Sequence, residues 1–328
     1  MSFIRPAKKD DLDRIIDFAM KAELGITSLP RNEKVLENRL LGSLSSFNKT
    51  VNEPGNERYY FVLEDPETNK IMGLSGIKAN TTVDHPLVTY KIEDDGNFFW
   101  LIPTIHTNAL TEIASLYLSP DFRKRGAGRL LSFSRFLFMS AFPHRFNETI
   151  FANLRGMISD KGDSPFWNNV TGRFHNHSFK ELMRRLDNDI LDYKHLLPNH
   201  PLCTLFLDSE ITKVLGKTDT QTLPAFEMLK EEGFEFLNEI DVMDGGPILY
   251  ADLKKIKTNQ HALLKRLTRF ADEGSASFVS NLSLDFRATI TGVQITGREA
   301  ALPKEAAEIL KVNLGDDLLI SPIHFEKK

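Results

Sequence analysis

The feature that most constrains this chain is a basic, glycine-bearing segment at residues 123–128, which lies between two runs of different periodicity. The preceding run, 112–120, is short and apolar and predicts a strand, whereas 129–142 has the apolar spacing of a helix. Two glycines let the backbone approach an anion closely and turn its N–H groups toward it. The following helix adds the positive end of its dipole. The segment therefore predicts a phosphate-binding loop between a strand and a helix.

The basic residues of this loop allow two other interpretations. A lone basic run is usually a solvated surface, but here the two glycines and the helix start favour phosphate. Nucleic acid is a poor ligand, because the run has no accompanying basic face or stacking aromatics and the chain carries a formal net charge of −4. We therefore expect no nucleic-acid partner.

Composition narrows the class of protein further. The single cysteine, Cys203, excludes an internal disulfide and a cysteine-rich metal site, which suits the reducing cytoplasm. The N-terminal segment has no apolar signal core, and no window of about 18 apolar residues predicts a membrane span. We expect a cytoplasmic protein with no metal and no membrane partner.

Strand and helix patterns together predict an α+β fold with a mixed sheet flanked by helices. Strands are expected at 3–6, 59–64, 71–77, 112–120, 149–155, 234–243 and 247–253, and helices at 10–20, 32–44, 129–142, 164–169, 180–196 and 222–232. Residues 80–108 predict an excursion from the sheet. Short strand patterns and one short helix after residue 256 predict a small β-rich C-terminal module at 257–328, which leaves 1–256 as the main domain.

The order of these elements around an Arg-x-x-Gly-x-Gly loop resembles the acyl-CoA N-acyltransferase (GNAT-like) fold. Longer motifs resemble one branch of it, arginine N-succinyltransferase; they lie at 25–30, 131–139, 154–156, 164–167, 197–201, 231–234 and 244–247. The resemblance covers nearly the whole chain, with gaps at 45–58 and 80–110. It implies transfer of a succinyl group from succinyl-CoA to the α-amino group of arginine, the entry step of arginine catabolism.

The resemblance implies that the loop holds the pyrophosphate of coenzyme A and that the preceding strand lines the cofactor through its backbone. The residues expected to bind the cofactor are Leu116, Tyr117, Leu118, Arg123, Lys124, Arg125, Gly126, Ala127, Gly128 and Arg129. A strand of this kind is equally expected to be buried, and both descriptions can hold because the contacts are made by backbone.

One departure from the family's pattern concerns catalysis. The family's catalytic histidine falls in a Gly-x-x-His-Pro-x-Thr segment, and the matching segment here, 216–222, carries Asp219 at that position. An unperturbed aspartate has a pKa near ~3.9 and a histidine one near ~6.5, a difference of roughly 3.5 kcal/mol in proton affinity. Asp219 can therefore orient the acceptor's ammonium group or relay a proton through water, or it can simply cap the helix that follows.

Two further residues are candidates for proton transfer. Glu112 begins the strand before the loop, where carboxylates serve as general base in several relatives of the fold; otherwise it is a surface charge at a strand end. His200 lies between two prolines, where it either replaces the missing histidine or is part of a rigid turn.

Acceptor binding rests on position alone. A guanidinium group favours a carboxylate pair and an aromatic face. Asp163, Asp241, Asp244 and Trp167 could supply these, although turn chemistry and core packing explain each of them equally well. Thr27 and Ser28 lie in the loop between the first two helices, where acceptors bind in the general fold, and Arg155 could meet the acceptor's carboxylate.

The partner expected is thus a small-molecule amine, and an oligomer is possible. Two alternatives stay open: an N-acyltransferase for a different amine, because Asp219 changes the site, or a paralogue that binds coenzyme A but has lost catalysis. Release of thiol from succinyl-CoA with a panel of amines separates them.

Overall fold

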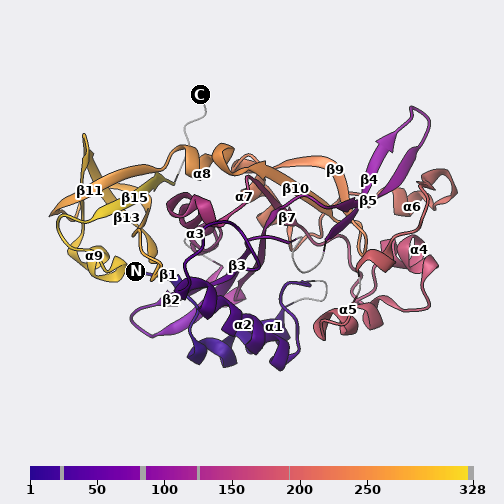
Figure 1. Cartoon of the computed structure of the whole chain (residues 1–328), viewed down its shortest axis with the longest axis horizontal. Coiled ribbons are helices and arrows are strands. Elements are labelled where there is room, and N and C mark those ends of the chain that lie inside the picture. Colours follow the sequence, from indigo (N-terminus) through magenta and orange to yellow (C-terminus); the bar gives the residue numbers. More distant parts are fainter. Residues whose placement is uncertain (23–25, 82–85, 124–125, 192, 324–328) are drawn as a thin grey trace.

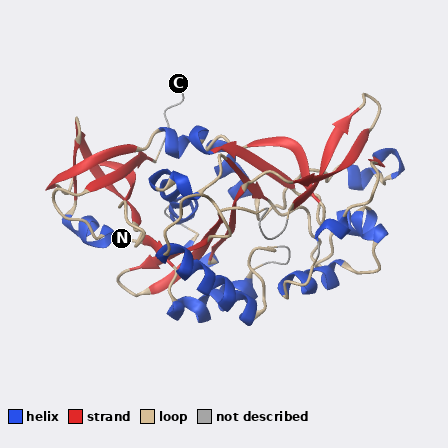
Figure 2. Ribbon diagram, in the orientation of Figure 1, coloured by secondary structure: helices blue, strands red, loops and turns tan. Residues whose placement is uncertain are grey.

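One mixed sheet of 15 strands runs through the part of the molecule that the computed structural model describes, residues 1–22, 26–81, 86–123, 126–191 and 193–323 (Figures 1 and 2). Its strands are β1 (Phe3–Pro6), β2 (Arg58–Asp65), β3 (Lys70–Lys78), β4 (Leu87–Asp94), β5 (Phe99–His106), β6 (Thr111–Leu118), β7 (Thr149–Asn153), β8 (Leu202–Cys203), β9 (Glu235–Asp241), β10 (Pro247–Asp252), β11 (Leu263–Phe270), β12 (Ser275–Ser280), β13 (Ala288–Thr296), β14 (Glu299–Leu302) and β15 (Asp317–Pro322). They lie in the order β12-β15-β11-β14-β13-β1-β2-β3-β6-β7-β10-β9-β4-β5-β8.

Helices cover the middle of this sheet and its two ends. They are α1 (Leu12–Lys21), α2 (Glu33–Asn48), α3 (Ala127–Ala141), α4 (Pro165–Asn169), α5 (Phe179–Asp187), α6 (Ser209–Thr212), α7 (Leu223–Glu231), α8 (Lys257–Gln260) and α9 (Lys304–Leu310). Within the described ranges, no helix is both long and apolar enough to cross a bilayer.

Strand β2 shows that the middle of the sheet is covered by helices on both faces. Its run 59–63 is continuously apolar because helices cover both faces. Tyr59, Phe61 and Leu63 belong to the core that contains α3, whereas Tyr60 and Val62 pack with α1 and α2 on the opposite face. The period-2 alternation of a strand thus divides one apolar run between two cores.

The sheet divides at β6. Strand β6 pairs with β3 along its length, but among the described residues it pairs with the parallel strand β7 only at Thr111 and Glu112. The register on β3 shifts between Leu74 and Gly76, and Ser115 on β6 has a left-handed φ of 54°, which together form a β-bulge. The two strands separate after Glu112, just before the bulge, and leave a gap in the sheet beside it.

The loop that precedes α2 holds this bulge in place. The backbone N–H of the buried Ser115 donates to Ser28 Oγ at 2.9 Å, and Ser115 Oγ donates to the carbonyl oxygen of Ser28 at 3.0 Å. A bulged residue leaves the regular ladder, so its N–H needs another acceptor. Ser28 supplies that acceptor and places its loop at the opening.

Two glycine-bearing segments close the far side of the gap through backbone contact. Gly156 follows β7, and Gly246 follows the turn between β9 and β10. A Cβ on Gly156 would lie 2.3 Å from the carbonyl oxygen of Asp244, and one on Gly246 would lie 2.1 Å from that of Leu154. Only glycine permits this approach, which holds residues 154–156 against the β9–β10 turn.

The C-terminal strands enclose a small core of their own. Figure 1 shows β11, β13 and β15 at the same end of the molecule as the N-terminus. Strand β13 pairs with β1 at Phe3 and Ile4, so the sheet continues from this module into the main body. Phe278 and Phe286 pack into the core that contains α3. A boundary at residues 256 and 257 stays a prediction.

Three regions differ from the sequence-based expectation. Residues 80–108 are not an excursion: their β4–β5 hairpin joins the sheet, because β4 pairs with β9. The helix expected at 180–196 ends at Asp187, and Asp189 has a positive φ. Strand β11 carries many polar residues and β14 is only four residues long, so the sequence pattern indicated neither of them. The strands expected at 59–64 and 71–77 are present as the paired β2 and β3, and the helices expected at 164–169 and 222–232 are present as α4 and α7.

The bulge makes a prediction about stability. Ser28→Ala should lower the free energy of unfolding by about 1–3 kcal/mol, because the buried N–H of Ser115 loses its acceptor. Urea denaturation measures this value, with the exposed Ser209→Ala as the matched control. Equal stability of the two variants would mean that Ser28 does not support the bulge.

Candidate functional site

Two pockets meet in the gap beside the bulge. The loop-side pocket, of about 670 Å³, is lined by the end of β6, the start of α3 and one face of α7. The polar pocket, of about 600 Å³, is lined by the loop before α2, by β4, and by residues around Asp189 and Tyr193. Both are lined by Thr27, Ser28, Glu112, Ala114, Asn153, Asp241 and Met243. A molecule in either pocket therefore reaches the same group of side chains.

The N-terminus of α3 opens onto the loop-side pocket. Gly126 precedes the helix with a left-handed φ of 78°, and the first turn carries no acidic side chain. The first backbone N–H groups of a helix have no partner within it, so they and the helix dipole offer a site for an anion. Lys124 and Arg125 lie outside the described residues.

The arginines that flank this helix start are differently engaged. Arg123 is exposed, and its Nε donates to the carbonyl oxygen of Leu118 at 3.2 Å. Arg129 pairs with Glu231 at 2.6 Å, both side chains being partly exposed. Both arginines line the loop-side pocket, together with Ala127 and Gly128.

The edge of β6 forms one wall of this pocket. Leu116, Tyr117 and Leu118 line it after β7 has separated from β6. An unpaired strand edge presents backbone N–H and C=O groups to whatever lies beside it. An extended chain with amide groups can therefore bind here as a strand would.

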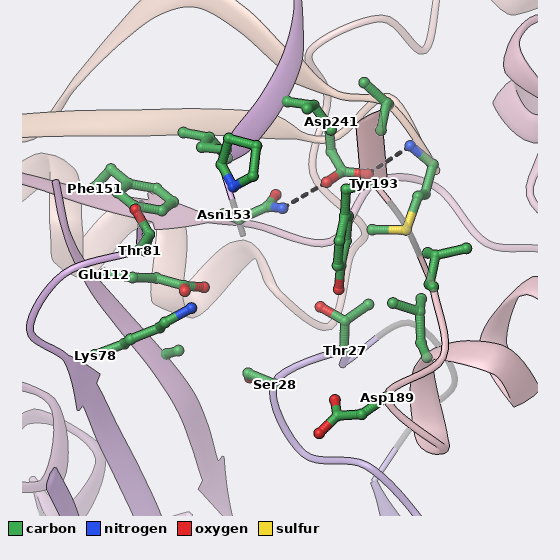
Figure 3. Close-up of a pocket in the computed structure, with 18 of the residues that line it drawn as sticks. Thr27, Ser28, Lys78, Thr81, Glu112, Phe151, Asn153, Asp189, Tyr193 and Asp241 are labelled. Carbon is green, nitrogen blue, oxygen red and sulfur yellow. Dashed lines mark hydrogen bonds between the residues drawn. The ribbon is translucent and has the colours of Figure 1, made fainter. Parts of the chain in front are cut away.

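Glu112 lies where the two pockets meet. Burial raises the pKa of its carboxyl, while the positive charges of Lys78, Arg58 and Arg39 partly oppose the rise. Figure 3 shows the Lys78 side chain pointing toward Glu112. A carboxylate with a raised pKa, open to two pockets, is suited to accept a proton.

A second carboxylate faces the junction from β9. Asp241 is buried and accepts hydrogen bonds from Asn153 Nδ2 at 2.6 Å and from the backbone N–H of Met243 at 2.7 Å (Figure 3). Asp244 is buried close by, and burial together with the charge of Asp241 raises its pKa. Two carboxyls so close favour retention of one proton between them.

The polar pocket carries charges of both signs. Arg39 of α2 pairs with Asp189 at 2.7 Å and donates to the carbonyl oxygen of Ser28 at 3.2 Å. Arg58 of β2 also lines this pocket. Burial raises the pKa of the Tyr193 hydroxyl, which keeps it neutral near pH 7. Such a set of charges suits a ligand that is itself a zwitterion.

Asp219 lines neither pocket, and its carboxylate is already engaged. It pairs with Arg155 at 2.9 Å, both side chains being buried, and accepts from the backbone N–H of Gln221 at 3.0 Å. Its carbonyl oxygen accepts from Thr222 and Leu223 at the start of α7. Arg155 and Thr222 line the loop-side pocket, so Asp219 acts on that pocket through its neighbours.

Three other predicted residues lie apart from both pockets. His200 is exposed on a loop, and Asp163 lies in a turn before α4. Trp167 is buried in a core cluster, and its indole N–H donates to the carbonyl oxygen of His177 at 3.0 Å. The structure thus supports turn and core explanations for Asp163 and Trp167 and brings Thr27, Ser28, Glu112 and Arg155 together.

The sequence pattern missed several pocket residues. Asn153, Lys78, Arg58, Arg39 and Tyr193 come from five different elements or loops. No local motif links them, because each follows from the topology of the sheet. A polar residue at the end of an apolar strand, as at Asn153 and Lys78, is the one signal that could have indicated them.

Comparison with known proteins places this geometry in context. A family model described as arginine N-succinyltransferase beta subunit matches residues 2–258, and the model of its C-terminal domain matches residues 269–322. A protein named arginine N-succinyltransferase from Enterobacter sp. (strain 638) is 33% identical over 348 aligned positions, covering 100% of this chain and 99% of the relative. A protein of the same name from Escherichia coli (strain 55989 / EAEC) is 32% identical, again covering 100% of this chain and 99% of the relative.

A solved structure agrees with the whole architecture. Arginine/ornithine succinyltransferase subunit AI from Pseudomonas aeruginosa superimposes with a TM-score of 0.89 at 27% identity, covering 99% of each chain. The α+β fold expected from the loop and the element order, with a mixed sheet flanked by helices, is therefore confirmed.

The ion pair of Asp219 makes a prediction. Asp219→Asn should lower the free energy of unfolding by about 3 kcal/mol, because it leaves the buried Arg155 without a counter-charge. Thermal and urea unfolding measure the loss, with Asp163→Asn, which lies in a turn outside both pockets, as the matched control. A stable variant with impaired turnover would instead assign Asp219 a direct catalytic role.

Proposed function

The chain belongs to the arginine N-succinyltransferase family, and from that premise we propose that it transfers a succinyl group from succinyl-CoA to the α-amino group of arginine. The observation that carries the proposal is the meeting of two pockets at Glu112. One pocket has the features of a coenzyme A site, and the other has the charges of an amino-acid site. Transfer between two molecules requires their reacting atoms to be held together, and the junction is where this would occur.

Coenzyme A would occupy the loop-side pocket. Its pyrophosphate would bind the backbone N–H groups at Gly126, Ala127 and Gly128, with Arg123 and Arg129 beside it. The amides of its pantetheine arm would pair with the open edge of β6 at Leu116–Leu118 as an added strand. This arrangement would bring the thioester to the bulge, next to Glu112.

Arginine would occupy the polar pocket. Its guanidinium group would approach the carboxylates of Asp189 and Asp241, and its carboxylate would approach Arg58. The α-amino group would then point to the junction. Thr27 and Ser28 would close the space between the two substrates.

Glu112 would act as the general base. The attacking amine must lose a proton, and a carboxylate with a raised pKa accepts it more readily than an ordinary one. The amine then attacks the thioester carbonyl, and the thiolate leaves as the amide forms. Backbone N–H groups of the open β6 edge next to the bulge would stabilise the oxyanion. In this scheme Asp219 is a positioning residue, since it holds Arg155 and the start of α7.

The substrate assignment is tested by thiol release from succinyl-CoA with arginine, ornithine, lysine and norleucine. Arginine should have the highest kcat/KM, and norleucine should be poor because it leaves the pocket's carboxylates without a cationic partner. Equal values for norleucine and arginine would reject arginine as the substrate. No release with any amine would favour the alternative of a coenzyme A-binding paralogue without catalysis.

The role of Glu112 makes a prediction about pH. In the parent protein kcat should fall as the pH decreases through the raised pKa of Glu112, because only the deprotonated base accepts a proton. Glu112→Gln should reduce kcat on the order of 100-fold and abolish this acid limb, with little change in the KM for succinyl-CoA.

The exposed Glu148→Gln serves as the matched control and should retain the parent profile. A Glu112→Gln variant with parent turnover and an unchanged acid limb would show that another group takes the proton.

A further inference from the structure

One buried cation in the loop-side pocket has no acidic partner among the residues that the structure describes. Arg135 on α3 is 2% exposed, and it donates two hydrogen bonds to Ser132 of the same helix, at 2.9 Å to the carbonyl oxygen and 2.9 Å to Oγ. Among the described residues, no carboxylate pairs with it. A guanidinium group has five N–H donors, so most of its capacity stays unused.

Buried charges are ordinarily paired, because leaving water without a counter-ion is costly. Two other buried guanidinium groups follow that rule: Arg5 pairs with Asp11, and Arg155 pairs with Asp219. The buried Arg145 lies outside both pockets and donates instead to Tyr59 Oη and to the carbonyl oxygens of Ser46 and Lys49. Burial alone lowers the pKa of Arg135 to about 9, which still leaves it protonated at neutral pH. Arg135 is thus a retained positive charge in a site that a ligand can enter.

The position of Arg135 along α3 indicates which part of the donor it faces. Helix α3 connects the parallel strands β6 and β7, so it runs back along the sheet. From Gly128 to Arg135 the helix rises about 10 Å. From Leu118 back to Ser115 the strand also covers about 10 Å. Arg135 is therefore level with the bulge, where the acyl group is expected, and not with the loop that would hold the pyrophosphate.

The surroundings of Arg135 are apolar. Ala152, Leu154 and Leu229 line the same pocket and are buried. In such a setting a charge-assisted, bidentate contact between guanidinium and carboxylate is strong. A neutral acyl chain would leave the cation unpaired, whereas an acyl chain with a terminal carboxylate would pair it.

We propose that Arg135 binds the terminal carboxylate of a dicarboxylic acyl donor and so selects succinyl-CoA over neutral acyl-CoA thioesters. The proposal deepens the proposed function and rests on it for the identity of the donor. The two hydrogen bonds from Arg135 to Ser132 hold the guanidinium in place, and they leave Nη1 and the second N–H of Nη2 for the two oxygens of the ligand's carboxylate.

The test compares succinyl-CoA with butyryl-CoA, which has the same chain length and no carboxylate, in the parent protein and in Arg135→Met. Calorimetry gives the Kd of each donor without any acceptor, and thiol release with arginine gives kcat/KM. Arg135→Met should raise the Kd for succinyl-CoA on the order of 100-fold and leave the Kd for butyryl-CoA unchanged or lower. Arg135→Lys should recover part of the preference, and free coenzyme A should bind all variants alike.

The matched control is Arg58→Met, which removes a cation from the polar pocket. It should raise the KM for the amine and leave the preference between donors intact. If Arg58→Met lost the preference for succinyl-CoA over butyryl-CoA and Arg135→Met kept it, the carboxylate of the acyl group would lie in the polar pocket. That result would overturn the proposal. Equal weakening of both donors in Arg135→Met would also overturn it, since that is what a structural role produces.

Failure of the substrate assignment is separable from failure of this proposal. A parent protein that binds succinyl-CoA through Arg135 and does not acylate arginine supports the donor site and rejects the acceptor. A parent protein that acylates arginine while Arg135→Met keeps its donor preference supports the reaction and rejects the role of Arg135.

Discussion

The bulge at Ser115 is the constraint on which the rest of the site depends. A regular β6 would pair with β7 along its length and leave no gap in the sheet. The left-handed φ of Ser115 costs about 1–2 kcal/mol for a residue with a side chain. Ser28 offsets this cost with two hydrogen bonds, and the same loop then lines both pockets. One local distortion thus produces the gap, the open strand edge and the junction.

Burial changes the pKa values of the ionisable side chains that surround this gap. The pKa of Glu112 and that of Asp241 are both raised because protein surrounds them, although cations near Glu112 partly oppose the effect. Arg135 has its charge in an apolar environment, and no acidic side chain in the described part of the chain pairs with it. Each of these groups is unfavourable for folding when considered alone. Their presence around one gap is what distinguishes a site for charged ligands from ordinary core.

The sequence could predict the parts of this account that local patterns determine. The strand, the glycine-bearing loop and α3 follow from periodicity and composition, whereas Glu112 became a candidate through the resemblance to relatives of the fold. The bulge could not be predicted, because Ser115 is an ordinary residue for a strand and its φ is imposed by partners. Asn153, Arg58 and Arg135 could not be assigned either, since their roles depend on which elements the topology brings together. Asp219 could be singled out because it occupies the position of the family's catalytic histidine. Its ion pair with Arg155 could not be predicted, because the two residues are far apart in the sequence.

The central claim is that two substrates occupy adjoining pockets at the same time and react where these meet. A conjugate in which the sulfur of coenzyme A is joined through a four-carbon linker to the α-amino group of arginine tests it most directly. If the pockets adjoin at Glu112, the conjugate should bind at least about 100-fold more tightly than coenzyme A and exclude both substrates. An affinity equal to that of coenzyme A, with arginine still able to bind the complex, would contradict the account.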